Sequence, residues 1–244
     1  MALTTIYVVR HGFRSNWDPD VTVPPPPPTG ITGDPSLSNH GREQAEELAQ
    51  FVASLQPPVQ AIISSPFYRC VETARPSALA TGLPVHLDNG VAEWYSRSRV
   101  THPSPASPEV LQQFFPDIAI AKDYEPTVVP STEGETYQEL EQRCAKALAQ
   151  LIDRFSDREA ILICTHAATK IVIGRALLND PNLMVRAGTC SIDKYTLNGN
   201  QWTIEWNGLT SFLSMGEERH WDFEQGDYAL LDAPAQSAKE HPPN

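Results

Sequence analysis

The chain has 244 residues, and its 30 acidic residues outnumber 18 basic ones to give a formal net charge of −12. At about 150 residues per domain this length predicts one or two domains, and 41% hydrophobic residues are enough for a sizeable core. Such acidity argues against direct nucleic-acid binding, and the absence of a long apolar run or a secretory signal argues against a membrane or secreted protein.

Strand and loop signals open the chain. Residues 4–9 (TTIYVV) form a short β-branched apolar run, typical of a buried strand, and it ends at Arg10 and His11. Residues 18–36 are rich in proline and glycine and include five consecutive prolines, which predicts a stiff surface loop or, as an alternative, a site for a proline-binding partner.

Two strand-helix units follow. Apolar spacing predicts a helix over 41–55, with Ser38 or Asn39 as its cap. Residues 59–63 read as a second strand, and a helix should follow to about residue 79 with Pro66 in its first turn.

The middle of the chain departs from this alternation. A short third strand is expected over 85–87. Residues 97–130 are rich in proline and serine, so we interpret them as an insertion over one end of the sheet, above the active site. The pair Thr132 and Glu135 has the spacing of a capping box for a helix over 136–155.

The last elements complete an α/β pattern. Residues 160–164 (AILIC) predict a buried strand with His166 just beyond it, and a helix to residue 178 should follow. Residues 191–206 predict a hairpin, and the polar tail 232–244 is expected to be disordered, which leaves one domain over 1–231.

Alternating strands and helices predict an open, mostly parallel sheet with helices on both faces. Ligands bind such sheets at the carboxyl ends of the strands, where His11 and His166 both fall.

Residues 10–14 (RHGFR) carry the strongest chemical signal. Two arginines on either side of an imidazole suit a phosphate dianion, and their charge disfavours imidazolium, which keeps the histidine nucleophilic. Gly12 should let the backbone approach a ligand closely. An isolated R-H-G is more often a surface histidine, but a place directly after a buried strand favours a site.

Two further segments point to the same pocket. Arg69 falls in the first turn of a helix that follows a strand, and His166 ends another strand. Taken singly, a solvated arginine and a hydrogen-bonded core histidine are the commoner interpretations. Residues 18–22 match the D-x-D-x-T pattern of aspartate-nucleophile phosphatases, but they lie in the proline-rich loop rather than at a strand end.

Cysteine, metal and nucleotide motifs are missing from the sequence. Cys70, Cys144, Cys164 and Cys190 form neither C-x-x-C pairs nor a Cys-x5-Arg motif, so we expect reduced thiols and no cysteine-based phosphatase. Neither phosphate-binding glycine motif nor H-E-x-x-H is present, and no metal or nucleotide cofactor is therefore expected.

Taken together, the motifs resemble the histidine phosphatase (phosphoglycerate-mutase-like) superfamily in order and spacing from about residue 4 to 210. They are R-H-G at 10–12, L-S-x-x-G-x-x-Q-A at 37–45, S-S-P-x-x-R-x-x-E-T-A at 64–74, G-E-T at 134–136 and the late Thr165-His166. A finer pattern of R-H-G-F-R-S-N-W, S-P-F-Y-R-C and A-E-W-Y is similar to two groups, the tau-subunit domains of transcription factor IIIC and the suppressor-of-T-cell-receptor-signalling phosphatases.

The resemblance implies a role for each matching residue. His11 becomes the nucleophile that forms phosphohistidine, while Arg10, Arg14, Arg69 and His166 hold the phosphoryl oxygens. Glu93 is implied as the group that protonates the leaving oxygen and then activates water. The competing interpretation of Glu93 is an exposed loop carboxylate.

Departures from related groups narrow the expected activity. Mutases carry an acidic residue where this chain has Phe13 and lack an arginine at the position of Arg14, which favours a phosphatase over a mutase. Ala167 stands where acid phosphatases have aspartate, so that branch fits poorly. Catalysis is expected to be metal-independent, because Arg10, Arg14, Arg69 and His166 would supply the positive charge. The neighbouring rings of Trp17, Trp94 and Tyr95 suggest aromatic phosphate esters such as phosphotyrosine, although they could equally pack under the loops.

A second hypothesis is a weakly active or inactive phosphatase fold that serves as a scaffold in a protein complex, such as an RNA polymerase III transcription factor. The tau-type domains are followed by a further partner-binding region, which we expect this chain to lack. Under the first hypothesis the partner is a phosphorylated protein or a small phosphate ester, in the cytoplasm or nucleus.

Overall fold

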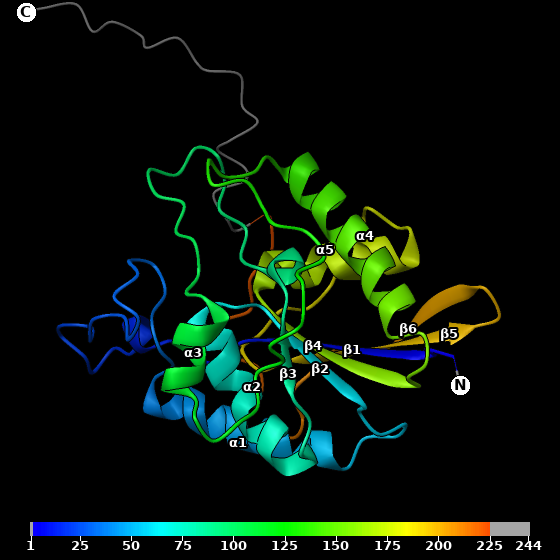
Figure 1. The fold of residues 1–244 in the computed structure, drawn as a ribbon, viewed down its shortest axis with the longest axis horizontal. Coiled ribbons are helices and arrows are strands. Elements are labelled where there is room, and N and C mark those ends of the chain that lie inside the picture. Colours follow the sequence, from blue (N-terminus) through cyan, green and yellow to red (C-terminus); the bar gives the residue numbers. More distant parts are fainter. Residues whose placement is uncertain (1, 225–244) are drawn as a thin grey trace, which may run out of the picture.

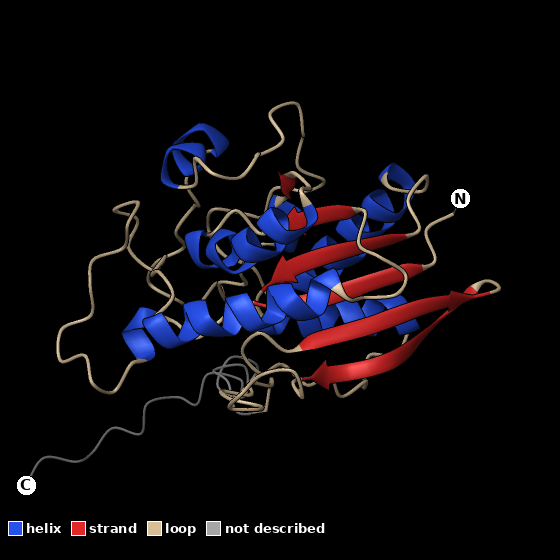
Figure 2. Cartoon of the chain, turned by 90° about the horizontal axis from the view of Figure 1, so that it is seen from below, coloured by secondary structure: helices blue, strands red, loops and turns tan. Residues whose placement is uncertain are grey.

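The computed structural model describes residues 2–224, and its core is one six-stranded sheet (Figure 1). The strands are β1 (Thr5–Arg10), β2 (Ala61–Ser64), β3 (Val85–Leu87), β4 (Ala160–Thr165), β5 (Ile192–Asn198) and β6 (Gln201–Leu209). Their order is β3-β2-β4-β1-β5-β6, in which the first four are parallel and the β5–β6 hairpin adds an antiparallel edge (Figure 2). The mostly parallel sheet expected from the alternating pattern is confirmed.

Helices cover both faces of the sheet (Figure 1). They are α1 (Asn39–Ala53), α2 (Tyr68–Thr81), α3 (Pro108–Phe114), α4 (Tyr137–Arg154) and α5 (Ala167–Leu178), with short 3₁₀ turns η1 (Ser15–Trp17) and η2 (Asn89–Val91). Side chains of β1 alternate between the faces: Ile6 packs in the cluster that includes α4 and α5, and Tyr7 in the cluster that includes α1 and α2. Because the parallel strands are buried on both faces, their sequences are continuous runs of mainly apolar residues.

Two helix starts differ from the sequence prediction. The capping box of α4 is formed by Thr136 and Glu139, not by Thr132 and Glu135. Both pairs have the required spacing, but Glu135 is instead buried in an ion pair with Arg143. Helix α2 begins at Tyr68, so Pro66 precedes the helix rather than lying in its first turn.

Residues 97–130 contain α3 and return to the sheet edge, where Ile120 forms a parallel bridge with Val85.

The predicted disordered tail lies outside the described residues. Within residues 2–224 no helix is both long enough and apolar enough to cross a membrane. All four cysteines fall in the described part of the chain and are free and buried, as expected.

Candidate active site

Strand register brings the two predicted histidines together. Arg10 and Thr165 are the last residues of β1 and β4 and pair with each other in the sheet. The next residue along, His11, donates its backbone N–H to the Thr165 carbonyl at 2.9 Å. As a result the His11 and His166 rings lie 5.4 Å apart between centroids, at the carboxyl edge of the sheet.

His11 is buried and has the protonation state of a nucleophile. Its Nδ1 lies 2.8 Å from the Gly12 carbonyl, which accepts only, so Nδ1 carries the proton and Nε2 keeps its lone pair. Burial lowers the pKa of His11 well below its usual range, and the charges of Arg69 and Arg10 lower it further. The imidazole is therefore neutral at pH 7.

Arg10, the last residue of β1, and Arg14, which directly precedes η1, bring positive charge to His11. The Arg10 guanidinium donates to the Ala187 and Arg219 carbonyls, and that of Arg14 stacks 3.9 Å from the Trp17 ring centre. Burial lowers the pKa of Arg10 to about 10 and that of Arg14 to about 9, with Arg69 adding to both shifts. Both side chains remain cations at neutral pH.

Arg69 is fully buried between two carboxylates. One terminal nitrogen lies 3.0 Å from Asp34 Oδ1 and the other 3.0 Å from Glu93 Oε2. Burial alone would lower the pKa of Arg69, but Glu93 and Asp34 together raise it above its usual value. The ion pair with Asp34 fixes the orientation of the Arg69 guanidinium, and its second terminal nitrogen faces the Glu93 carboxylate.

His166 lies at the N-terminus of α5, fully buried among polar groups. Its Nε2 lies 2.7 Å from Ser65 Oγ, and its Nδ1 lies 3.2 Å from Arg69 and 3.3 Å from Glu93 Oε2. The Cys70 thiol is 3.4 Å from Nε2. These contacts hold the ring in one orientation beside the Glu93 carboxylate.

The loop that carries Glu93 is hydrogen-bonded to β4 and α5, so Glu93 is not the exposed loop carboxylate of the competing interpretation. Thr165 Oγ1 donates to the Val91 carbonyl at 2.6 Å, and Thr169 Oγ1 donates to Ala92 at 2.8 Å. The Glu93 side chain is 19% exposed. Burial alone would raise the pKa of Glu93, but contacts with His166 and Arg69 hold it well below its usual range.

A cavity of about 300 Å³ has a lining that includes Arg10, His11, Arg14, Trp17 and Glu93, and Arg69 and His166 contact it through Glu93. The buried Nε atoms of Arg10, Arg14 and Arg69 have no hydrogen-bond partner among the described residues. Buried donors that lack a partner are costly. Three guanidiniums near a neutral imidazole suit a tetrahedral oxyanion, because their charge and their forked donors match its oxygens.

The same cluster could in principle ligate a metal, because one ligand atom each from His11, Glu93 and His166 lie within 4.8 Å of one another. The charges around them argue against a divalent cation. Arg69 is in direct contact with Glu93, and Arg10 and Arg14 also line the site. Their positive charge repels a metal ion and attracts an anion.

Sequence reasoning missed several supporting residues. Asp34 lies in the proline-rich loop, yet it is fully buried against Arg69. Gln44 of α1 accepts from the Phe13 backbone N–H at 3.0 Å and so fixes the nucleophile segment. Gly12 was expected to allow approach of a ligand, but a Cβ there would meet the Gly41 carbonyl at 2.7 Å, so it permits close packing of α1 instead.

The aromatic residues near the motifs divide between packing and the site. Trp17 lines the cavity, with its ring 5.9 Å from that of His11. Trp94 also borders the cavity but is 93% buried, and its indole N–H donates to the Glu135 carbonyl. Tyr95 lies on the other side of this segment, in a second cavity. Trp94 therefore has a large packing role.

The mostly parallel sheet, with two histidines side by side at its carboxyl edge and a cluster of guanidiniums around them, matches the architecture of the histidine phosphatases. The chain matches the model of the histidine phosphatase superfamily (branch 1) over residues 6–210 and belongs to that family.

Among curated proteins, the chain is 38% identical to the transcription factor tau 55 kDa subunit of Saccharomyces cerevisiae, with 92% of this chain and 59% of that protein covered. It is 26% identical to the human ubiquitin-associated and SH3 domain-containing protein A, over 74% of this chain and 32% of that protein. The chain thus spans about three fifths of the yeast relative and about a third of the human one.

Solved structures share the fold. The ecdysone phosphate phosphatase from Bombix mori aligns with a TM-score of 0.68 at 16% identity, covering 91% of this chain and 98% of that one. A phosphoserine phosphatase mutant from Entamoeba histolytica aligns with a TM-score of 0.58 at 19% identity, covering 86% and 100%. The predicted phosphoglycerate-mutase-like fold is confirmed.

Proposed function

We propose that this protein hydrolyses phosphate monoesters through a phosphohistidine at His11. The observation that carries the proposal is a buried, neutral imidazole with a free Nε2 that lies close to the positive charges of Arg69, Arg10 and Arg14. Arg10, Arg14 and Arg69 bind the phosphoryl oxygens and stabilise the charge that develops in the transition state. His166 completes the phosphate site from the end of β4.

The reaction proceeds in two displacements. The Nε2 lone pair of His11 attacks phosphorus as the bond to the ester oxygen breaks, and the leaving oxygen takes a proton from Glu93. The alcohol departs, and the Glu93 carboxylate then accepts a proton from water. The resulting hydroxide oxygen attacks phosphorus, the P–N bond breaks and inorganic phosphate leaves.

Glu93 is a carboxylate in the free site, yet the first step needs it protonated. The substrate resolves this difference, because its negative charge offsets Arg69 and His166, the groups that lower the pKa of Glu93. A phosphate ester that binds as a monoanion also brings one proton with it. Transfer of that proton to Glu93 leaves the phosphoryl dianion among the arginines.

We further propose a preference for aromatic phosphate esters. Trp17 supplies a ring beside the nucleophile, and Phe13 stands where mutases carry an acidic residue. An offset ring contact contributes roughly 0.5–1.5 kcal/mol beyond burial. We expect kcat/KM for a phosphotyrosine peptide or 4-nitrophenyl phosphate to exceed that for 3-phosphoglycerate, as measured by phosphate release. Equal or faster turnover of phosphoglycerate would contradict the preference.

Catalysis should need no metal ion. The guanidiniums of Arg10, Arg14 and Arg69 supply the positive charge that Mg²⁺ or Zn²⁺ gives other phosphoryl-transfer enzymes. Dialysis against a chelator should leave the hydrolysis rate unchanged, with rates compared before and after the removal. A loss of activity that Mg²⁺, Mn²⁺ or Zn²⁺ restores would show that the cluster of His11, Glu93 and His166 binds metal.

A second candidate function is a subunit of a transcription-factor complex in the nucleus. The 38% identity to the yeast tau 55 kDa subunit favours it and extends over 92% of this chain. The two functions are compatible, because the surface that binds a partner need not include the phosphate site. Purification of the tagged full-length protein with its partners tests the complex, and a phosphatase assay on that material tests the activity.

A further inference from the structure

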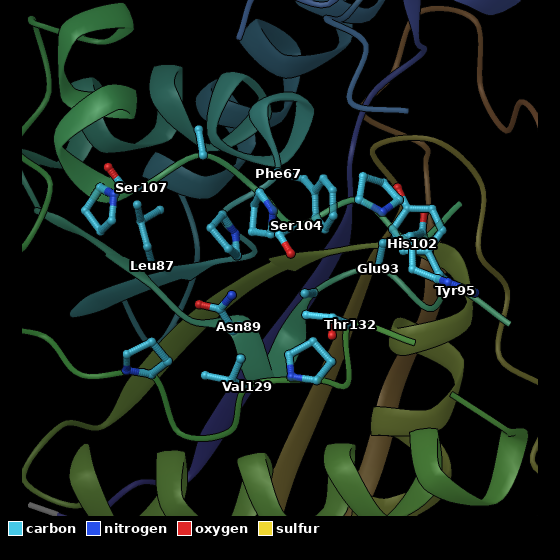
Figure 3. A pocket seen from close by; sticks show the side chains of 18 of the residues that line it. Phe67, Leu87, Asn89, Glu93, Tyr95, His102, Ser104, Ser107, Val129 and Thr132 are labelled. Atoms are coloured by element: carbon cyan, nitrogen blue, oxygen red, sulfur yellow. The ribbon is translucent and has the colours of Figure 1, made fainter. Parts of the chain in front are cut away.

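A second, larger cavity of about 400 Å³ adjoins the phosphate site (Figure 3). One of its walls comes from residues 102–109 and another from residues 121–135, with Leu87 and Asn89 between them. Figure 3 shows Ser104 and Asn89 on opposite sides of this space, and Glu93 and Tyr95 at one end of it. Most of this lining comes from segments that none of the catalytic motifs includes.

The segment from Glu93 to Ser96 separates the two cavities. Its residues alternate: Tyr95 lines the larger cavity, whereas Trp94 and Ser96 line the phosphate cavity. Glu93 lines both. The proposed proton donor is thus the residue at which the two spaces meet.

Phe67 lies between the larger cavity and the groups of the phosphate site. Its ring lines that cavity, packs edge-on against His166 at 5.5 Å and lies 5.7 Å from Tyr95. The Arg69 guanidinium stands 4.9 Å from the same ring. The aromatic wall of the larger cavity therefore starts directly beside groups that bind phosphate.

We propose that the larger cavity binds the organic part of the substrate, an inference that rests on the proposed hydrolase activity. A general acid must lie within hydrogen-bond distance of the oxygen it protonates. The group attached to that oxygen is therefore held next to Glu93 while the phosphoryl group occupies the arginine site. The larger cavity begins at Glu93 and has room for more than one ring.

The lining defines the chemical class of that group. Flat faces are abundant, since Phe67, Tyr95 and His102 are joined by Pro66, Pro103, Pro105, Pro108, Pro126 and Pro130. Apolar faces of this kind bind flat rings by burial and offset stacking. Of the carboxylates that line the cavity, Glu93 and Glu135 lie in ion pairs with Arg69 and Arg143, which leaves Glu109 and Glu125 against one lysine, Lys122. The cavity thus suits an extended, flat group that is neutral or cationic, and it disfavours a second anionic group.

Matched substrates test this inference. Phenyl phosphate and 4-biphenylyl phosphate have similar leaving groups but differ in length. A third ester, 4-biphenylyl phosphate with a carboxylate on its distal ring, keeps that length and adds a negative charge. We expect the wild-type protein to show a kcat/KM about tenfold higher for the biphenylyl ester than for the phenyl ester, and the carboxylate to remove that gain. Ser104→Trp and Asn89→Phe fill the cavity from opposite walls. Each should lower kcat/KM for the biphenylyl ester to about that for the phenyl ester. Both variants should lower kcat/KM for phenyl phosphate less than for the biphenylyl ester, because the shorter group reaches less far into the cavity.

Ser156→Trp adds the same ring on an exposed turn after α4 and should leave both substrates unaffected. The inference fails if the biphenylyl ester has no advantage, if the carboxylate has no effect, or if the cavity-filling variants slow both esters alike. A wild-type protein that hydrolyses neither ester would instead overturn the proposed function, and the inference with it.

Discussion

Replacement of His11 by alanine should abolish phosphate-ester hydrolysis, with a loss of roughly 10³-fold or more in kcat. His11 lines the phosphate cavity with an imidazole whose Nε2 is free to attack phosphorus, whereas both ring nitrogens of His166 face other side chains, Ser65 and Arg69. Arg10, Arg14 and Arg69 would still bind the dianion, so the variant should retain affinity for inorganic phosphate. Initial rates and phosphate binding by calorimetry separate the two effects.

The covalent intermediate gives a second measurement of the same step. Rapid quenching of the wild-type protein with labelled substrate should trap a phosphoryl group that is labile to acid and stable to base, as expected for phosphohistidine. His86→Ala is the matched control, because His86 lies on β3 against Phe155 rather than in the phosphate site. Label that persists in His11→Ala, or turnover close to wild type, would assign the nucleophile to another residue.

Short-range patterns were enough to locate the centre of the site. An apolar run that ends in Arg10-His11, and another that ends before His166, each mark a buried strand followed by a reactive residue. Parallel pairing of β1 with β4 then places the two histidines side by side, because their strands end in register. Arg69 could be placed likewise, since it follows a strand by a few residues.

Residues that act through long-range partners could not be predicted in this way. Asp34 lies in a loop whose composition indicates exposure, and only the fold shows that it is buried against Arg69. The capping box was misplaced for a similar reason. Thr132 with Glu135 and Thr136 with Glu139 have the same local spacing, and the burial of Glu135 against Arg143 decides between them.

The cavity that adjoins Glu93 also depends on tertiary structure. Residues 102–109 and 121–135 each indicate irregular chain, and neither segment encloses a space alone. Trp94 and Tyr95 are neighbours in sequence, but strand-like alternation directs them into different cavities. The sequence could show that aromatic rings gather near the proposed acid, but not which of them face a substrate.

Replacement of Glu93 by glutamine should slow esters in proportion to how poorly their alcohol leaves. General acid catalysis contributes about 10²–10⁴-fold where the leaving oxygen must be protonated, and much less where the departing anion is already stable. We therefore expect a large loss of kcat/KM, which reports the phosphorylation step, for phenyl or alkyl phosphates and a small one for dinitrophenyl phosphate. The second displacement is common to all esters, so kcat itself should fall for each of them. A series of substituted phenyl phosphates, plotted against leaving-group pKa, should have a steeper slope for Glu93→Gln than for the wild type.

Glutamine keeps the size of the side chain but removes the charge that faces Arg69 and His166. Part of any loss could then come from a disturbed arginine rather than from the missing proton. Asp34→Asn is the control, because it removes the other carboxylate on Arg69 without touching the proton donor. That variant should lower kcat/KM by a similar factor for every ester, since phosphate binding is common to all of them. If Glu93→Gln also lowered kcat/KM by the same factor for every ester, Glu93 would be a positioning residue for Arg69, and the proton would have to come from elsewhere.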